Sequence, residues 1–301
     1  MSESAGTLYV VATPIGNTED ITARARRILA EADIVAAEDT RTTQKLFTIL
    51  GIQNRTISNH RFNEKSQVDF LVSELENGKN VAIVSDAGTP CISDPGGIIV
   101  KAAAERGIKI TGVCGPSSVI TALSVCGFCF DSFAFYGFLP KSAREIKKII
   151  DTITHSDIKT FVLFESPKRV KKFFEILAVE LPEARVCLCN DISKMFERIY
   201  RGMPKNILNE LNENPSAEKG EYTIVINTEL SHNALEMTND SQPAEELTAE
   251  ALIIDYMVKN NGTVKDAVNA LHVIYGEKIP KKEFYNASIR LRSILRDAGH
   301  D

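Results

Sequence analysis

The residues with the clearest chemical potential lie in one stretch, NVAIVSDAGTPCISDPGG, at positions 80–97. Its apolar run, 81–84, is typical of a strand buried on both faces of a sheet. Asp86 and Asp94 follow that strand and could accept hydrogen bonds from hydroxyls or from a cationic group. Gly88 lets the backbone approach a ligand closely. Because open α/β sheets bind ligands at the carboxyl ends of their strands, the stretch predicts a ligand-binding loop.

The same stretch also has a plainer interpretation as a strand-to-helix connection. Asp94 would then cap the following helix, and Pro95 would be its first residue. We expect this cap to form as well. Capping alone does not require the preceding Ser-Asp-Ala-Gly-Thr-Pro, so we favour a ligand loop over a plain connection.

A second group of polar side chains, Glu38-Asp39-Thr40-Arg41, follows the short strand predicted at 33–37. Two adjacent carboxylates and an arginine at a strand end indicate either a functional site or the start of a helix. Asp39 or Thr40 could cap a helix over 42–50. Both interpretations can hold together.

Two further loops carry charged residues. His60 lies in the loop 59–64, although a lone histidine is more often structural than catalytic. Lys194, Glu197 and Arg198 follow the strand predicted at 185–189. Solvated loop charges and a functional site are about equally good interpretations of that second set.

The first part of the chain alternates strands with helices, which predicts a parallel, doubly wound sheet. Neither the dinucleotide pattern GxGxxG nor the phosphate-binding pattern GxxxxGK[ST] occurs. The amino terminus of the helix predicted at 119–126 offers N–H groups to an anion or a carboxylate. The five strands expected are 7–12, 33–37, 55–58, 81–84 and 109–113.

The pattern then changes, because strands come closer together with fewer crossover helices. We predict strands at 133–140, 159–165, 185–189 and 221–226, with a helix over 168–180, in a mixed α+β domain. The predicted domains are therefore an N-terminal α/β domain (1–115), a second α/β domain (116–228), an acidic linker (229–246) and a helical tail (247–301).

The tail should contain helices at 247–259, 263–271 and 281–296, and it carries many Lys and Arg residues. The turn around 261–267 resembles that of a helical hairpin, so a helix-turn-helix-like nucleic-acid module is one interpretation. A solvated tail, or one that packs in a dimer, is nearly as good an interpretation.

Composition sets broad limits on the function. The chain has 301 residues, 44% hydrophobic content and a net charge of -5, which argues against non-specific coating of nucleic acid but allows a local basic patch. No apolar run is long enough for a membrane span, and no signal peptide is visible, so we expect a cytoplasmic protein. The six cysteines include one CxxC without a partner motif, so we predict free thiols and no metal site.

Six stretches, taken together, resemble the tetrapyrrole (corrin/porphyrin) methylase-like class of S-adenosylmethionine-dependent methyltransferases. Within that class, the chain is most similar to bacterial 16S ribosomal RNA methyltransferases that modify a cytidine 2'-O-ribose. The similarity runs through residues 7–227. The stretches are LYVVATPIGNTEDIT (8–22), EDTRTTQKL (38–46), VSDAGTPCISDPGG (84–97), GPSSVITAL (115–123), FYGFLPK (135–141) and FESPKRV (164–170).

The resemblance implies a two-domain α/β fold with S-adenosylmethionine in the cleft between the domains, followed by a small helical domain. It also implies a homodimer that acts on 16S rRNA in the small ribosomal subunit, with the basic tail docking the RNA. The family's cofactor contacts would fall on Pro14, Gly16, Asp86, Ala87, Gly88, Ile92, Ser117, Ser118 and Phe164.

Such a methyl transfer is an in-line displacement, in which a ribose hydroxyl must be positioned and lose its proton. Glu38 or Asp39 would be the base, and Lys194 would stabilise the developing charge. No metal is required. Residues suited to RNA phosphates are Arg41, His60, Arg198, Lys281, Lys282 and Arg290.

Two other functions fit the same residues. The first is methylation of a small tetrapyrrole, although such a substrate has no need of a basic helical tail. The second is a non-catalytic protein that keeps the cofactor pocket and binds RNA or assists ribosome assembly.

Overall fold

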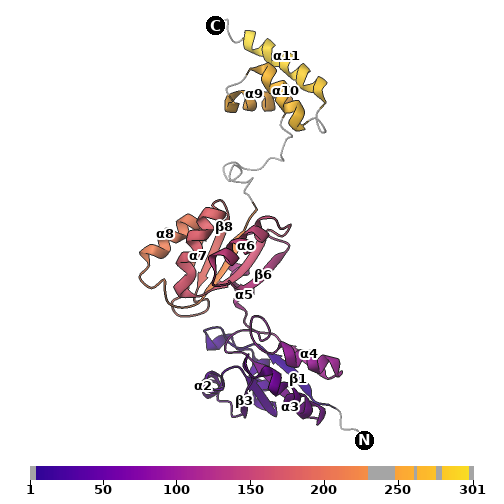
Figure 1. The fold of residues 1–301 in the computed structure, drawn as a ribbon, viewed down its shortest axis with the longest axis vertical. Coiled ribbons are helices and arrows are strands. Elements are labelled where there is room, and N and C mark those ends of the chain that lie inside the picture. The colour runs from indigo at the N-terminus through magenta and orange to yellow at the C-terminus, as the bar shows by residue number, and fades with distance from the viewer. Residues whose placement is uncertain (1–4, 230–247, 261–262, 276–279, 298–301) are drawn as a thin grey trace. The chain divides into compact units, whose positions relative to one another are not determined.

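A computed structural model describes residues 5–229, 248–260, 263–275 and 280–297 of the chain (Figure 1). The chain divides into two compact units, with the boundary after Ser231. The first unit contains two sheets and the second contains helices. All of the predicted acidic linker, 229–246, apart from Glu229, lies outside the described residues.

The first sheet is parallel throughout and has the strand order β3-β2-β4-β1-β5, so the doubly wound prediction is confirmed. Helices α1 and α2 cover one face, while α3 and α4 cover the other. The central strands β2 and β4 are buried along their whole length, because both faces are covered. The elements are β1 (Thr7–Val11), α1 (Ala23–Glu31), β2 (Ile34–Ala37), α2 (Thr40–Leu50), β3 (Thr56–Ser58), α3 (Glu64–Glu76), β4 (Val81–Val84), α4 (Gly97–Glu105) and β5 (Lys109–Val113), with a short 3-10 helix at Thr18–Asp20.

Helix α4 begins later than the sequence predicts. It starts at Gly97 rather than Pro95, and Asp94 is not its cap. The Glu64 carboxylate, which is buried, instead accepts hydrogen bonds from the N–H groups of Gly96 and Ile98, each at 2.9 Å. The first N–H groups of α4 are therefore satisfied from α3, and the Asp94 side chain remains available for another role.

Asp39 caps helix α2, which is one of the two interpretations of the Glu38–Arg41 segment. Its side chain accepts a hydrogen bond from the Arg41 N–H at 2.8 Å and caps α2, which begins at Thr40. The N-cap prediction for Asp39 is thus confirmed, although the helix starts two residues earlier than expected.

The second sheet has both parallel and antiparallel pairs of strands, in the order β6-β7-β10-β8-β9. Only β6 and β7 run parallel. Helices α6, α7 and α8 cover one face and α5 covers the other. Its elements are α5 (Ser118–Val125), β6 (Phe133–Phe138), α6 (Ala143–Thr154), β7 (Thr160–Glu165), α7 (Pro167–Glu180), β8 (Arg185–Asn190), β9 (Arg198–Gly202), α8 (Pro204–Glu213) and β10 (Tyr222–Asn227).

Three of these elements, α6, α8 and β9, were not predicted. Strand β9 is five residues long, begins with the charged Arg198 and lies at the edge of the sheet. An edge strand buries little of its surface, so it lacks the continuous apolar run that marks central strands such as β10.

The second unit contains the three helices predicted for the tail, α9 (Ala249–Asn260), α10 (Val264–Tyr275) and α11 (Lys281–Asp297). Each contributes buried apolar side chains to one core, including Ile253, Leu271 and Phe284. Thr263 and Asp266 bond reciprocally at the start of α10, as in a capping box. None of the helices that the structure describes is long and apolar enough to span a membrane.

We expect Glu64→Ala to loosen the start of α4, because it leaves one buried and one partly buried N–H group without an acceptor. The cost should be about 1–3 kcal/mol. Hydrogen exchange at Gly96 and Ile98 should accelerate in this variant. Glu64→Gln keeps an acceptor oxygen and should show a smaller effect, and Glu105→Ala, on the exposed end of α4, serves as control. Unchanged protection of both amides in Glu64→Ala would contradict the role given to this carboxylate.

Candidate functional site

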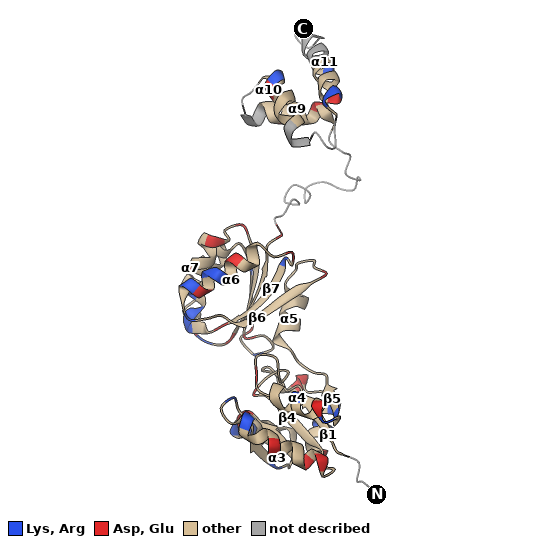
Figure 2. Ribbon diagram, turned by 45° about the vertical axis from the view of Figure 1, so that its right-hand side comes forward, with Lys and Arg blue, Asp and Glu red and all other residues tan. Residues whose placement is uncertain are grey.

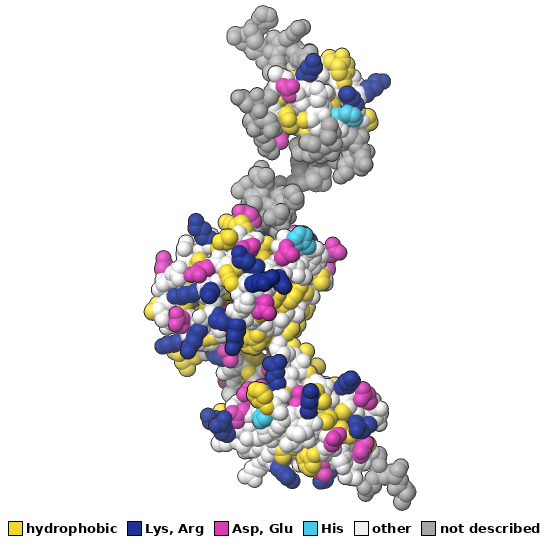
Figure 3. All heavy atoms as spheres, in the orientation of Figure 1, with side chains coloured by type: hydrophobic (Ala, Val, Ile, Leu, Met, Phe, Trp, Pro, Cys, Tyr) yellow, Lys and Arg dark blue, Asp and Glu magenta, His cyan; other side chains and the backbone are white. Residues whose placement is uncertain are grey.

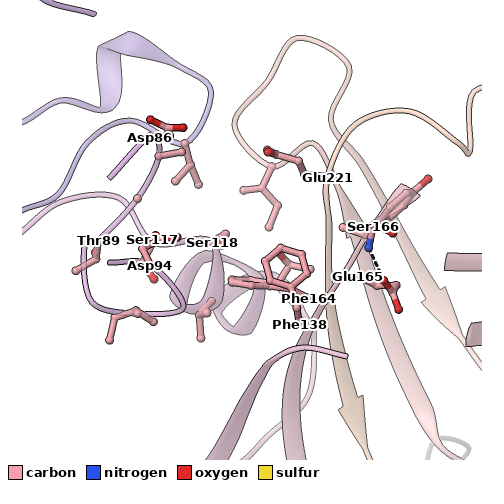
Figure 4. A pocket seen from close by; sticks show the side chains of 18 of the residues that line it. Asp86, Thr89, Asp94, Ser117, Ser118, Phe138, Phe164, Glu165, Ser166 and Glu221 are labelled. Atoms are coloured by element: carbon pink, nitrogen blue, oxygen red, sulfur yellow. Dashed lines mark hydrogen bonds between the residues drawn. The ribbon is translucent and has the colours of Figure 1, made fainter. Parts of the chain in front are cut away.

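A cavity of about 360 Å³ lies in the first unit, between the carboxyl edge of the first sheet and one end of the second (Figure 4). Its volume is in the range of small-molecule sites. The first sheet contributes Ile15, Glu38, Asp86, Ala87, Gly88, Thr89, Ile92 and Asp94. The remainder of the chain contributes Ser117, Ser118, Val119, Phe138, Phe164, Glu165, Ser166, Pro167, Ile192, Glu221, Tyr222 and Thr223.

The loops that follow β1 and β4 are joined by a pair of backbone hydrogen bonds. Thr13 and Gly88 each donate to the other's carbonyl, at 2.9 and 3.0 Å. Gly88 has a φ of +80°, and a Cβ on it would lie 3.4 Å from the Ile15 side chain. This position therefore favours glycine, and its backbone is open to the cavity.

The ends of β2 and β4 are joined through two carboxylates. Glu38 accepts a hydrogen bond from the Asp86 N–H at 3.3 Å, and Asp86 accepts one from the Asp39 N–H at 3.0 Å. Burial raises the pKa of Glu38 and of Asp86, and neighbouring carboxylates raise both further. These side chains are therefore held close together by the backbone despite their mutual repulsion.

Asp94 is the third carboxylate of this wall. Burial, together with the negative charge of Glu38, raises its pKa to about 6. Among the described residues that line the cavity, none is Lys or Arg. The wall formed by Glu38, Asp86 and Asp94 can therefore accept hydrogen bonds from hydroxyls or offset positive charge on a ligand.

The opposite wall is aromatic. The rings of Phe138 and Phe164 have their centroids 5.3 Å apart, and Phe135 packs edge-on against Phe164 behind them. Figure 4 shows Asp86 and Asp94 on one side of the cavity and Phe138 with Phe164 on the other. A ligand with a flat apolar part and a polar or cationic part would match both walls.

Ser117 and Ser118 line the cavity at the start of α5. The Ser117 hydroxyl accepts a hydrogen bond from the Ile120 N–H at 3.5 Å, and the Thr89 hydroxyl donates to the Pro116 carbonyl at 3.3 Å. The second of these bonds ties the loop after β4 to the segment that leads into α5.

Asp39 does not line the cavity, although sequence reasoning made it a candidate base. Its bonds with the Arg41 side chain and backbone lower its pKa to about 2. A carboxylate with so low a pKa is a weak base, whereas the neighbouring Glu38 lines the cavity and has a raised pKa. Arg41 is exposed beside it.

His60 is held by hydrogen bonds to a neighbouring residue of its own loop. Its backbone N–H and its ring Nδ1 both bond with Asn63, at 2.7 and 3.2 Å. It lies near enough to Glu38 to lower that residue's pKa slightly, but it does not line the cavity.

Lys194 also lies outside the cavity lining. Its ammonium donates to Asp191 at 3.0 Å and to Glu221 at 2.6 Å. Burial acts to lower the pKa of Lys194, but these two carboxylates outweigh it and raise the pKa. The stem of the side chain lies against Gly16, where an added Cβ would be 2.3 Å from Lys194 Cγ. Lys194 therefore holds the loop after β8 against the loop after β1.

The remaining predicted residues are dispersed. Pro14 and Gly16 flank Ile15, which lines the cavity, but do not themselves line it. Arg198 is exposed at the start of β9. In the second unit, Lys281 and Lys282 are exposed, whereas Arg290 forms an ion pair with Glu250 across α11 and α9.

Several cavity residues were not among the sequence-based candidates. Phe138 and Ser166 follow the rule that ligands meet strands at their carboxyl ends, so that rule could have indicated them. Glu221, Tyr222 and Thr223 come from the amino-terminal end of β10, which reaches the cavity because β10 is antiparallel to β7. No local pattern predicts that pairing. Among the described residues, no group of His, Cys, Asp or Glu is arranged to hold a metal ion.

Comparison with known proteins adds family information to this geometry. The sequence model for Tetrapyrrole (Corrin/Porphyrin) Methylases matches residues 7–207. "Ribosomal RNA small subunit methyltransferase I" of Bacillus subtilis is 36% identical over 282 residues, which are 94% of this chain and 94% of that protein. The protein of the same name from Haemophilus influenzae is 38% identical over 254 residues, covering 84% of this chain and 89% of its own length.

Among solved structures, a diphthine synthase is similar in fold, with a TM-score of 0.57 and 16% sequence identity. The alignment covers 77% of this chain and 94% of the diphthine synthase.

We expect Asp94→Asn to stabilise the protein at pH 8 but not at pH 3.5. The pKa of this carboxyl is raised to about 6 in the folded state from 3.8, so its ionisation opposes folding above pH 6, and below 3.8 both states are protonated. Urea unfolding at the two pH values measures the difference. Asp131→Asn, at an exposed position, is the control. An Asp94→Asn effect of equal size at both pH values would contradict the assignment.

Proposed function

Since the chain belongs to the tetrapyrrole methylase family and is a methyltransferase, we propose that it methylates the 2'-hydroxyl of a cytidine ribose in the 16S RNA of the small ribosomal subunit. The main support is the extent of similarity to relatives named as small-subunit ribosomal RNA methyltransferases. An alignment over 94% of the chain takes in most of the helical second unit, whereas the family model stops at residue 207. A tail of that kind suits an RNA substrate better than a small tetrapyrrole.

The proposed methyl donor is S-adenosylmethionine, and the cavity residues fit it. This cofactor has a flat adenine, a ribose with two hydroxyls, and positive charge on its sulfonium and amino groups. The Phe164 wall suits the adenine, while Asp86, Asp94 and the serines Ser117 and Ser118 suit the polar groups. When bound, the cofactor supplies an electrophilic methyl group. The residues we assign to its binding are Ala87, Gly88, Ile92 and those just named, with Pro14 and Gly16 positioning Ile15.

Glu38 is the proposed general base. It lines the cavity, and its raised pKa makes it a stronger proton acceptor than Asp39. Its carboxylate would take the proton from the ribose hydroxyl as that oxygen attacks. Asp39 would keep Arg41 and α2 in place. Because Lys194 is bonded to Asp191 and Glu221, we assign it to positioning the loop that carries Ile192.

We assign four exposed basic residues to RNA phosphates, Arg41 and Arg198 in the first unit and Lys281 and Lys282 in the second. The half-buried His60, which lies near Glu38, is assigned to the same role. Arg290 would support α9 rather than contact RNA. We also propose that the protein works as a homodimer, which light scattering would measure directly.

A transfer assay tests the proposed reaction. Purified protein and methyl-labelled S-adenosylmethionine are mixed with small ribosomal subunits from cells that lack the enzyme. We expect label in a single cytidine, recovered as a nuclease-resistant 2'-O-methylated dinucleotide. Label on a base instead of the ribose would overturn the proposed position. Cofactor binding without any label on RNA would favour the tetrapyrrole or the non-catalytic alternative.

Matched variants test the base within the same assay. Glu38→Gln should bind the cofactor but lose transfer by about 100-fold or more, the usual contribution of a general base. Asp39→Asn should lose much less, since that carboxylate faces Arg41. Equal losses in both variants would show that Glu38 has no special role in proton removal.

Gly88→Val should abolish cofactor binding, as measured by calorimetry. A branched side chain is strained at a φ of +80° and would meet Ile15 on the cavity side. Gly97→Ala is the matched control, because a Cβ at Gly97 meets nothing within 4 Å. Retention of wild-type affinity by Gly88→Val would remove this backbone segment from the site.

A further inference from the structure

Helices α6 and α7 of the second sheet carry a concentration of basic side chains, which we call the α6–α7 basic face. Figure 2 shows Lys and Arg segments along both helices, and Figure 3 shows these side chains gathered over the same part of the surface. The two helices pack against each other. The α6–α7 basic face consists of Lys141, Arg144, Lys147, Lys148, Lys168, Lys171 and Lys172.

The outward direction of these side chains follows from the amphipathic pattern. On α6, Ile146, Ile150 and Ile153 are buried. On α7, Val170, Phe173, Phe174 and Leu177 are buried in the same core. The basic residues occupy the remaining helix faces and are exposed, apart from the half-buried Lys171.

The net charge of residues 141–180, which contain α6 and α7, is positive, whereas the net charge of the whole chain is negative. Residues 141–180 contain nine Lys or Arg and six Asp or Glu, whereas the whole chain contains 35 and 40. Two basic residues are already paired, Arg169 with Glu165 and Lys147 with Glu180. Within the described part of the chain, no ion pair involves Lys141, Lys148 or Lys172, so their charge is available to a partner.

The distribution of charge along the helices is not the one that stabilises them. All seven basic residues lie in or just before the first two turns, where Glu145 is the one acid, and Asp151, Glu175 and Glu180 lie later. A helix dipole favours the opposite order, with acids near the amino terminus and bases near the carboxyl terminus. A solvated helix face with no further role gains nothing from this reversed arrangement.

The α6–α7 basic face begins at the rim of the cavity. Phe138 lines the cavity and Lys141 follows three residues later, while Ser166 and Pro167 line it and Lys168 comes next. Both helices start at the same edge because β6 and β7 are parallel. A polyanion bound along α6 and α7 would therefore have one end at the cavity.

We propose that the α6–α7 basic face binds the phosphate backbone of the RNA substrate and leads the target nucleotide to the cavity. This inference rests on the proposed function. It places an RNA-docking surface in the first unit, in addition to the helical tail. Lysine-rich surfaces suit phosphates, which release counterions on binding, whereas lysine is depleted in protein–protein interfaces.

The test compares two triple variants with the same net charge. The first replaces Lys141, Lys148 and Lys172 by Gln. The control replaces Lys45, Lys101 and Lys109, which are exposed lysines of the first sheet and its helices, by Gln. Each variant removes three positive charges. Any effect of the protein's net charge on RNA binding is therefore the same in the two variants. Thermal unfolding and calorimetry with S-adenosylmethionine check that fold and cofactor binding are unchanged.

The measurement is filter binding of small-subunit ribosomal RNA between 50 and 200 mM salt, with KM for the same RNA in parallel. Each lost phosphate contact should flatten the salt slope by about 0.7–0.9. The first variant should therefore lose about 2 units of slope, so that its deficit in RNA affinity relative to the wild type is about 16-fold greater at 50 mM than at 200 mM salt, with kcat unchanged. The control should match the wild type.

Two results would overturn the inference. One is an equal loss in both triple variants, which would indicate a general field effect. The other is a changed oligomeric state of the first variant with unaltered RNA binding, which would make this face a protein contact. Filter binding also separates this inference from the proposed reaction. If the wild type transfers no methyl group, but the first variant loses salt slope and the control variant does not, the basic face stands and the proposed reaction fails.

Discussion

The arrangement of the cavity depends on one buried carboxylate that is not in it. Glu64, at the start of α3, satisfies the first N–H groups of α4. Without that acceptor, Asp94 would be the natural cap for the helix, as the sequence around it suggests. With it, the segment Cys91–Gly96 can remain a loop in which Cys91 and Ser93 have positive φ, and Asp94 lines the cavity. A helix cap supplied from another element thus leaves a carboxylate free to line the cavity.

Some residues of the motifs that carry the family resemblance line the cavity, whereas others hold the surrounding elements in place. Asp86 and Gly88 line the cavity, but Arg169 of FESPKRV does not. It bonds with the carbonyls of Leu139 and Pro140 and with the buried Glu165, and so joins the end of β6 to the start of α7. This support fixes where Phe138 and Phe164 stand in the aromatic wall. A motif residue can therefore shape the cavity without lining it.

The sequence was sufficient for the first sheet because its central strands are continuous apolar runs ending in Gly, Pro or Asp. It was also sufficient for two cavity residues, Asp86, which follows the buried strand β4, and Ser117, which caps the helix after β5. It failed where position depends on strand pairing. Glu221 reaches the cavity through the antiparallel pairing of β10, and Lys194, which does not line the cavity, is bonded to Glu221 and to Asp191. Both outcomes depend on residues distant in the chain, so no local pattern encodes them.

The acidic wall of the cavity and the proposed RNA substrate make opposite electrostatic demands on the protein. Glu38, Asp86 and Asp94 concentrate negative charge where a polyanionic substrate would have to approach. RNA binding at the cavity itself would therefore be opposed unless positive charge lay close by. The α6–α7 basic face supplies that charge at the rim, on the opposite side from the carboxylates. Under the proposed function, a cationic cofactor and an anionic substrate would meet at one cavity, with the attraction for each coming from a different sheet.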